Sequence, residues 1–389
     1  MMKYLYTIAF AGVLLQAAAQ TNELCQGAYY TEAQGAEKLR ALRNRLRTKE
    51  AWAAHADSIR NHIRKGMGLE VWPAKTPLNP RFRNKKTMDG YTVEAVAFES
   101  FPGFYVTGNL YRPTATAKPK SLAAVLCPHG HSSDTKNGGR LSEAAQTRSA
   151  ALARMGSVVF AFDMIGYGES DQLPHKFEKV LALQTWNSIR AIDFLLSLLE
   201  VDESRVAVTG ESGGGTQTFI LTALDERVKA SVPVVMVSAH FFGGCSCESG
   251  MPIHKNGKTV YTNAEIASLA APRPMLLVSD GQDWTENTET VEFPFAKKVY
   301  QLVGAEGFVE NVHLASEGHD YGPSKRVAMY NFLARHLKLQ MWGVMRDGRI
   351  DESFVKVLPR EELVFFKSNE LASLTKGDAL YTTFRSQIK

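Results

Sequence analysis

The chain has 389 residues, of which 44% are hydrophobic and 22% charged, and its formal net charge is +5 at pH 7. This composition is typical of a globular protein long enough for a large core or two domains. The charge is modest and dispersed, which argues against a nucleic-acid-binding protein. Four cysteines in so long a chain do not make a disulfide scaffold, and their pairing stays open.

The first twenty residues have the composition of a secretory signal peptide. Lys3 is their only charge, residues 8–15 form an apolar core, and three alanines precede Gln20. The apolar run is too short to span a bilayer. We therefore expect a cleaved leader over residues 1–20, a periplasmic or secreted protein, and no stable membrane insertion.

The next segment, residues 21–80, is expected to be an N-terminal helical extension. Apolar residues recur at three- and four-residue steps from 32 to 65, and the arginines between them fit a solvated helix face. Alternation in residues 91–100, followed by 104–111, predicts a β-hairpin or meander.

From residue 122 the chain repeats a pattern of strand, loop and helix. Apolar strands are expected at 122–127, 157–162, 206–208, 228–237, 275–279 and 309–314. Helices are expected at 142–155, 183–199, 216–224 and 324–337. Continuously apolar strands separated by helices predict an α/β domain with a mostly parallel central sheet covered by helices on both faces. We assign this domain to residues 81–338 and a small C-terminal appendage to 339–389.

One stretch of this domain has the pattern of a nucleophile elbow. Gly210-Glu-Ser-Gly-Gly214 follows the 206–208 strand directly and precedes a helix. A serine at such a sharp strand-to-helix turn presents its hydroxyl at the sheet edge, so Ser212 is the predicted nucleophile. Taken alone, the motif also fits a glycine-rich turn that binds phosphate.

A serine nucleophile needs a base, and the base needs an acid that orients it. His319 follows the last strand in a glycine-flanked loop and is the predicted base, whereas His313 lies inside a strand pattern. Asp283 comes after the preceding strand and a glycine-led turn, and it is the predicted acid in preference to Asp280.

The oxyanion hole requires backbone N–H groups directed at the developing negative charge. We expect them from Gly213, just after the nucleophile, and from His131, in the loop after the 122–127 strand. The residues expected to line the substrate pocket are His129, His240, Phe241 and Trp284.

The two histidines of this loop and Cys245-Ser-Cys247 are residue types that can bind a metal. Adjacent side chains in an irregular loop rarely converge on one ion, and no histidine or cysteine pair at zinc spacing accompanies the cysteines. We therefore expect neither a metal nor a cofactor.

With these motifs the chain resembles the α/β-hydrolase superfamily, and within it the acetylxylan-esterase-like group of secreted bacterial hydrolases. The resemblance covers about residues 76–337. It rests on the stretches 89–94, 104–113, 128–131, 210–218, 271–278 and 283–285. It implies hydrolysis of carboxylic esters, often on plant polysaccharides, with Ser212, Asp283 and His319 in the family's catalytic positions.

The resulting hypothesis is a secreted serine esterase that removes acetyl groups from an esterified carbohydrate through a Ser-His-Asp acyl-enzyme mechanism. Two alternatives stay open. One is a serine peptidase or a dienelactone-type lactone hydrolase on the same fold. The other is a glycan-binding relative that has lost catalysis. The oligomeric state is not addressed by the sequence.

Overall fold

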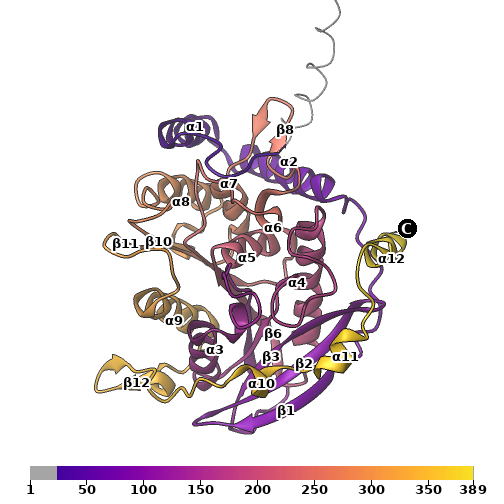
Figure 1. The fold of residues 1–389 in the computed structure, drawn as a ribbon. Helices are drawn as coiled ribbons and strands as arrows, with labels where there is room; N and C mark the ends of the chain where they lie inside the picture. The colour runs from indigo at the N-terminus through magenta and orange to yellow at the C-terminus, as the bar shows by residue number, and fades with distance from the viewer. Residues whose placement is uncertain (1–23, 389) are drawn as a thin grey trace, which may run out of the picture.

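A nine-stranded sheet organises the chain in the computed structural model, which describes residues 24–388 (Figure 1). Its order is β1-β2-β3-β5-β4-β6-β7-β10-β11. The strands are β1 (Arg81–Thr87), β2 (Tyr91–Phe101), β3 (Phe104–Pro113), β4 (Leu122–Cys127), β5 (Ser157–Phe162), β6 (Val201–Glu211), β7 (Ala230–Val234), β10 (Met275–Asp280) and β11 (Val309–Leu314). The predicted signal peptide lies outside the described residues.

The sheet is antiparallel at one side and parallel over the rest. β1, β2, β3 and β5 pair antiparallel, and every neighbouring pair from β5 through β11 is parallel. In the centre of the sheet Val125 of β4 pairs with Val159 of β5 and Ala207 of β6. The carboxyl ends of the parallel strands therefore lie along one edge, where sites in such sheets form.

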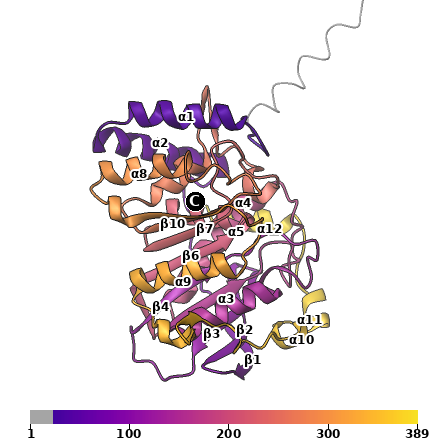
Figure 2. The same ribbon diagram turned by 90° about the vertical axis from the view of Figure 1, so that its left-hand side faces the viewer.

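Helices cover both faces of the sheet, as the sequence predicts (Figures 1 and 2). One face is covered by α3 (Glu143–Arg154) and α9 (Pro323–Leu337), whose apolar side chains share one core cluster. The second, larger cluster contains side chains of α1 (Glu32–Arg45), α2 (Lys49–Met67), α4 (Val180–Leu196), α5 (Gly213–Leu224), α7 (Asn263–Ala267) and α8 (Glu292–Leu302). The fold is that of an α/β-hydrolase.

The N-terminal helical stretch is divided into two helices, α1 and α2. The chain turns between them, and the hydroxyl of Thr48 accepts a hydrogen bond from the N–H of Ala51 at the start of α2. Thr48 is therefore a polar cap that starts a second helix within an otherwise continuous apolar pattern.

Two further elements, the edge strand β1 and the helix α8, were not predicted from the sequence pattern. Residues 339–388, in the predicted C-terminal appendage, contain the short helices α10 (Arg360–Leu363), α11 (Ser368–Ala372) and α12 (Ala379–Ser386). This stretch contacts the main domain. The carboxylate of Glu169, which lies in that domain, accepts hydrogen bonds from the N–H groups of Phe365 and Phe366.

The remaining short elements lie in connections. They are α6 (Ser246–Ser249) and the hairpins β8 (Lys255–Asn256) with β9 (Thr259–Val260) and β12 (Met345–Arg346) with β13 (Arg349–Ile350). Among residues 24–388, no helix is both long and apolar enough to cross a bilayer.

Candidate active site

Ser212 occupies a strained turn between β6 and α5. Its backbone angles are φ 54° and ψ −122°, a region that side-chain-bearing residues rarely adopt. Glycines allow strand and helix to approach each other, since a Cβ on Gly210 would lie 2.8 Å from the carbonyl oxygen of Gly214, and they let the turn pack against the loop after β4. A Cβ on Gly210 would lie 2.3 Å from the carbonyl oxygen of Pro128, and one on Gly214 would lie 2.5 Å from the same oxygen. These are the steric requirements of a nucleophile elbow.

His319 follows β11, Asp283 follows the neighbouring strand β10, and the two side chains form a short hydrogen bond. His319 Nδ1 lies 2.6 Å from Asp283 Oδ2, and the Asp283 side chain is only 3% exposed. The other oxygen of Asp283, Oδ1, accepts from the N–H of Thr285 at 2.6 Å and from its hydroxyl at 2.5 Å. The aspartate is therefore held on both oxygens, and it holds the imidazole in turn.

The strand order brings these groups to one edge of the sheet. Ser212 follows β6, Asp283 follows β10 and His319 follows β11, and these strands run parallel in the order β6-β7-β10-β11. Within residues 24–388 the Ser212 hydroxyl makes no hydrogen bond, to His319 or to any other group, so a direct serine–histidine contact stays a prediction. His313 lies in β11 and contacts Ser279, with 3.0 Å between His313 Nδ1 and the Ser279 hydroxyl oxygen.

The loop that carries His319 is anchored from below by a buried lysine. Lys325 Nζ donates to the carbonyl of Gly318 at 2.6 Å and to Asp320 Oδ1 at 2.9 Å, and it lies 3.4 Å from Asp280. Burial, together with the nearby charge of Asp283, raises the pKa of Asp280. Asp280 is thus the lysine's partner, and Asp283 is the aspartate that contacts the imidazole.

Two backbone N–H groups at the elbow have no partner in the described part of the chain. They belong to His131 and Gly213, the residues predicted for the oxyanion hole. The two residues are adjacent in space. If Gly213 had a Cβ, that atom would lie only 2.9 Å from Cε1 of the His131 ring. Free N–H donors beside a strained serine are what an oxyanion hole requires.

The four predicted pocket residues occupy different environments. Trp284 stacks on Phe241 with 4.0 Å between ring centroids and contacts the ring of His319 at 4.6 Å. These two aromatic side chains form a wall beside the candidate base. His240 is buried, its Nδ1 lies 3.2 Å from the Ser238 hydroxyl oxygen, and burial lowers its pKa.

His129 is a correction to the predicted pocket. Its side chain is buried, and both ring nitrogens are used within the protein. Nδ1 lies 2.7 Å from the carbonyl of Gly130, and Nε2 accepts from the N–H of Met164 at 3.1 Å. A histidine with both nitrogens occupied has no polar atom left for a substrate, so His129 shapes the loop instead.

A second group of side chains meets beside the elbow and was not anticipated. The nitrogen and sulfur ligand atoms of His131, His175, Cys245 and Cys247 lie within 4.8 Å of one another. A hydrogen bond from Cys247 lowers the pKa of Cys245 far below its usual value, and bonds to the two histidines act in the same direction. The sequence predicted no metal because His129 and His131 are not expected to converge and no histidine accompanies the two cysteines; in the structure His175 joins His131 and the cysteines in one cluster.

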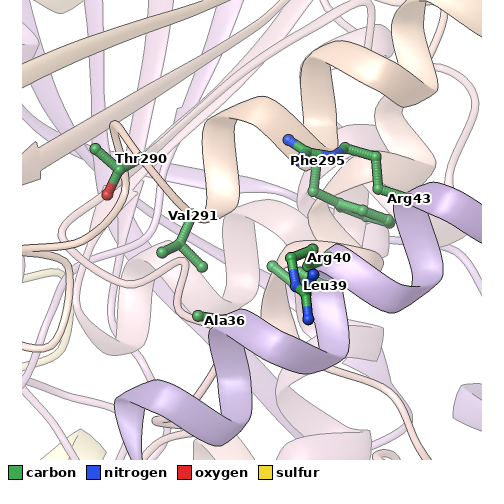
Figure 3. A pocket seen from close by; sticks show the side chains of 7 residues that line it. All are labelled: Ala36, Leu39, Arg40, Arg43, Thr290, Val291 and Phe295. Carbon is green, nitrogen blue, oxygen red and sulfur yellow. The ribbon is translucent and has the colours of Figure 1, made fainter.

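A separate cavity of about 150 Å³ lies between α1 and the start of α8 (Figure 3). Leu39, Arg40 and Arg43 line it from α1, and Thr290 and Val291 line it from the other side. None of the candidate catalytic side chains contributes to this cavity, so the elbow remains the candidate active site.

Comparisons with known proteins find related hydrolases. The acetyl xylan esterase (AXE1) family model matches residues 183–243, which contain the elbow. A solved structure named methylesterase BT1017 is 37% identical with a TM-score of 0.82, covering 92% of this chain and 80% of that chain. YtaP of Bacillus subtilis (strain 168) is 24% identical over 233 residues, which is 54% of this chain and 74% of that protein.

A more distant structure shares the fold alone. A CE15 glucuronoyl esterase from Teredinibacter turnerae T7901 is 12% identical with a TM-score of 0.55, over 75% of this chain and 86% of that chain. The methylesterase match is both long and above 30% identity. The chain therefore belongs to the acetylxylan-esterase-like family of α/β-hydrolases, which are serine ester hydrolases.

Proposed function

We propose that the protein hydrolyses carboxylic esters of a carbohydrate with Ser212 as nucleophile, His319 as base and Asp283 as the acid that orients it. The observation that carries the proposal is the 2.6 Å hydrogen bond between His319 Nδ1 and Asp283 Oδ2, at the sheet edge where the elbow presents Ser212. A carboxylate accepts, so Nδ1 carries the hydrogen and Nε2 keeps a lone pair for the serine proton.

The reaction proceeds in two halves. Ser212 Oγ attacks the ester carbonyl while His319 Nε2 takes its proton, and the negative charge forms on the carbonyl oxygen. The N–H groups of Gly213 and His131 stabilise that charge. His319 then gives the proton to the departing alcohol oxygen, and water hydrolyses the acyl-enzyme by the same route. Asp283 stabilises the imidazolium and does not itself take a proton.

Two ester bonds fit this chemistry, and they differ in which part stays on the enzyme. A methyl ester on a sugar carboxyl group would leave the sugar acid on Ser212 and release methanol. An acetyl ester on a sugar hydroxyl group would leave an acetyl group on Ser212 and release the sugar, and water would then release acetate. The methyl ester is the first candidate, because the similar methylesterase spans 92% of this chain. The acetyl ester is the second, because the acetyl xylan esterase model matches the elbow region.

A two-substrate assay tests the proposal. Purified protein is incubated with methyl-esterified polyuronate and with acetylated xylan, and released methanol and acetate are measured. We expect methanol release that Ser212→Ala abolishes and that Ser386→Ala, a change at an exposed serine in α12, preserves. Acetate release alone would support the second candidate. Release of either product that persists in Ser212→Ala would remove Ser212 from the mechanism.

We also propose export to the periplasm or the medium, on the signal-peptide pattern of residues 1–20. Amino-terminal sequencing of the protein recovered from a cell fractionation tests this. A mature chain beginning near Gln20 in the exported fraction is expected. An intact leader on a protein retained in the cytoplasm would contradict it.

A further inference from the structure

Three loops at the carboxyl edge of the sheet bring two imidazoles and two thiols together. His131 follows β4, His175 follows β5, and Cys245 and Cys247 follow β7. His131 Nε2 lies 3.0 Å from His175 Nε2 and 3.1 Å from Cys247 Sγ. His175 Nε2 lies 3.1 Å from Cys245 Sγ. None of these contacts is needed for the proposed hydrolysis.

The outer ring nitrogens of the two imidazoles differ in their surroundings, and the contact of His175 fixes its hydrogen. His175 Nδ1 is 2.7 Å from the carbonyl oxygen of Ile165, which can only accept, so Nδ1 carries the hydrogen. His131 Nδ1 faces the carboxylate of Glu248, with 3.6 Å between Nδ1 and Oε1. With the hydrogen of a neutral His131 ring on Nδ1, on the side of that carboxylate, both Nε2 atoms present lone pairs to each other. Lone pairs 3.0 Å apart repel unless a cation or a shared proton lies between them.

A zinc ion fits the spacing of these atoms. Tetrahedral zinc with bonds of about 2.0 Å to nitrogen and about 2.3 Å to sulfur places nitrogen atoms about 3.3 Å apart and nitrogen and sulfur about 3.5 Å apart. The three contacts of 3.0 to 3.1 Å are within about half an ångström of these values. Small side-chain movements would therefore complete the geometry. A set of two thiolates and two imidazoles favours zinc over magnesium or calcium, which prefer oxygen ligands.

The surroundings of the cluster resemble the outer contacts of known zinc sites. Metal-bound histidines usually donate their second N–H to a carbonyl or carboxylate, as His175 does to Ile165 and as His131 is placed to do to Glu248. The buried Glu248 also accepts the N–H groups of Gly244 and Cys245, at 2.9 and 3.0 Å. One carboxylate thus supports both a histidine and the turn that carries the thiols.

We propose that His131, His175, Cys245 and Cys247 bind one structural zinc ion beside the active site. Four protein ligands fill a tetrahedron and leave no open position for water or substrate, which is typical of structural rather than catalytic zinc. The ion ties together three loops, one of which carries the backbone N–H of His131. It therefore fixes the loop that we assign to the oxyanion hole.

Metal analysis of the purified full-length protein tests this proposal independently of any esterase activity. We expect about one zinc ion per chain. Cys245→Ser and His175→Ala should each lower the zinc content to less than about a tenth of the wild-type value, because three ligands hold zinc far more weakly than four. The matched control is Cys25→Ala, a buried thiol outside the cluster, which should keep its zinc.

Cobalt substitution keeps the test decisive if a variant does not fold. Zinc is removed from the wild-type protein with a chelator and replaced by Co²⁺. A thiolate-to-cobalt absorption band, with a higher melting temperature in the metal-loaded than in the metal-free protein, is expected. Protein that contains no zinc and binds no cobalt would overturn the proposal. So would an intact mass two hydrogens below that of the reduced chain, with the bond mapped to Cys245 and Cys247.

Discussion

Replacing Asp283 by asparagine is expected to remove most of the activity while leaving the fold intact. Asp283 Oδ1 accepts two hydrogen bonds from Thr285, and Oδ2 accepts the one from His319. In Asp283→Asn the amide oxygen keeps the two bonds from Thr285, because only an oxygen can accept there. The amide NH₂ group must then face His319.

That orientation forces the wrong form of the imidazole. An NH₂ group donates, so His319 Nδ1 has to accept, and the ring hydrogen moves to Nε2. A protonated Nε2 cannot take the proton of Ser212. The tautomer change in a serine–histidine–aspartate site costs about 10⁴-fold in kcat, or about 5.5 kcal/mol. We expect a loss of about 10³- to 10⁴-fold here.

The assay is kcat/KM for hydrolysis of an aryl acetate, measured beside a thermal melt. Asp280→Asn is the matched control, since Asp280 contacts Lys325 instead of the imidazole. We expect the control to keep its rate to within about tenfold, because that change leaves the acid–histidine bond in place. Activity within about tenfold of wild type in Asp283→Asn, with a large loss in Asp280→Asn, would refute this assignment.

Three further substitutions test the scaffold. Lys325→Met leaves Asp280 as an unpaired buried charge. It should lower the free energy of unfolding by about 3–5 kcal/mol in urea titrations. A loss below about 1 kcal/mol would contradict the role of Lys325 in holding the His319 loop. Gly214→Ala places a Cβ 2.5 Å from the carbonyl oxygen of Pro128, so the melting temperature should fall by several degrees, and an unchanged value would contradict the close packing. Burial raises the pKa of Glu292 from 4.5 to about 7, so only the unfolded chain ionises fully between these pH values and stability falls as pH rises through them. Glu292→Gln should therefore raise the free energy of unfolding by up to about 3 kcal/mol at pH 8 and by little at pH 4. Equal effects at both pH values would contradict the raised pKa of Glu292.

The central strands of the parallel sheet were predictable because they are buried on both faces. Residues 122–127 and 157–162 are continuous apolar runs, and β4 and β5 have these same bounds. β1 was missed because Arg-Phe-Arg-Asn-Lys-Lys-Thr is almost entirely polar, as befits an exposed edge strand. Pattern alone does not distinguish such a strand from a loop.

The candidate site was likewise predictable only in part. Ser212, Asp283 and His319 each follow the end of a parallel strand, β6, β10 and β11, so chain order and a local motif locate them. The burial of His129 and the meeting of His175 with the two cysteines depend on how three loops fold over one another. No spacing within a single segment carries that information, so the cluster is visible only in three dimensions.

Covalent labelling with a fluorophosphonate probe tests whether Ser212 is the activated nucleophile. The probe reacts with a serine hydroxyl only where a base removes its proton. Peptide mapping is predicted to find the label on Ser212, with none on the Ser212→Ala protein and slower labelling of Asp283→Asn. An active enzyme that takes up no label, or that carries it on another residue, would contradict the mechanism proposed here.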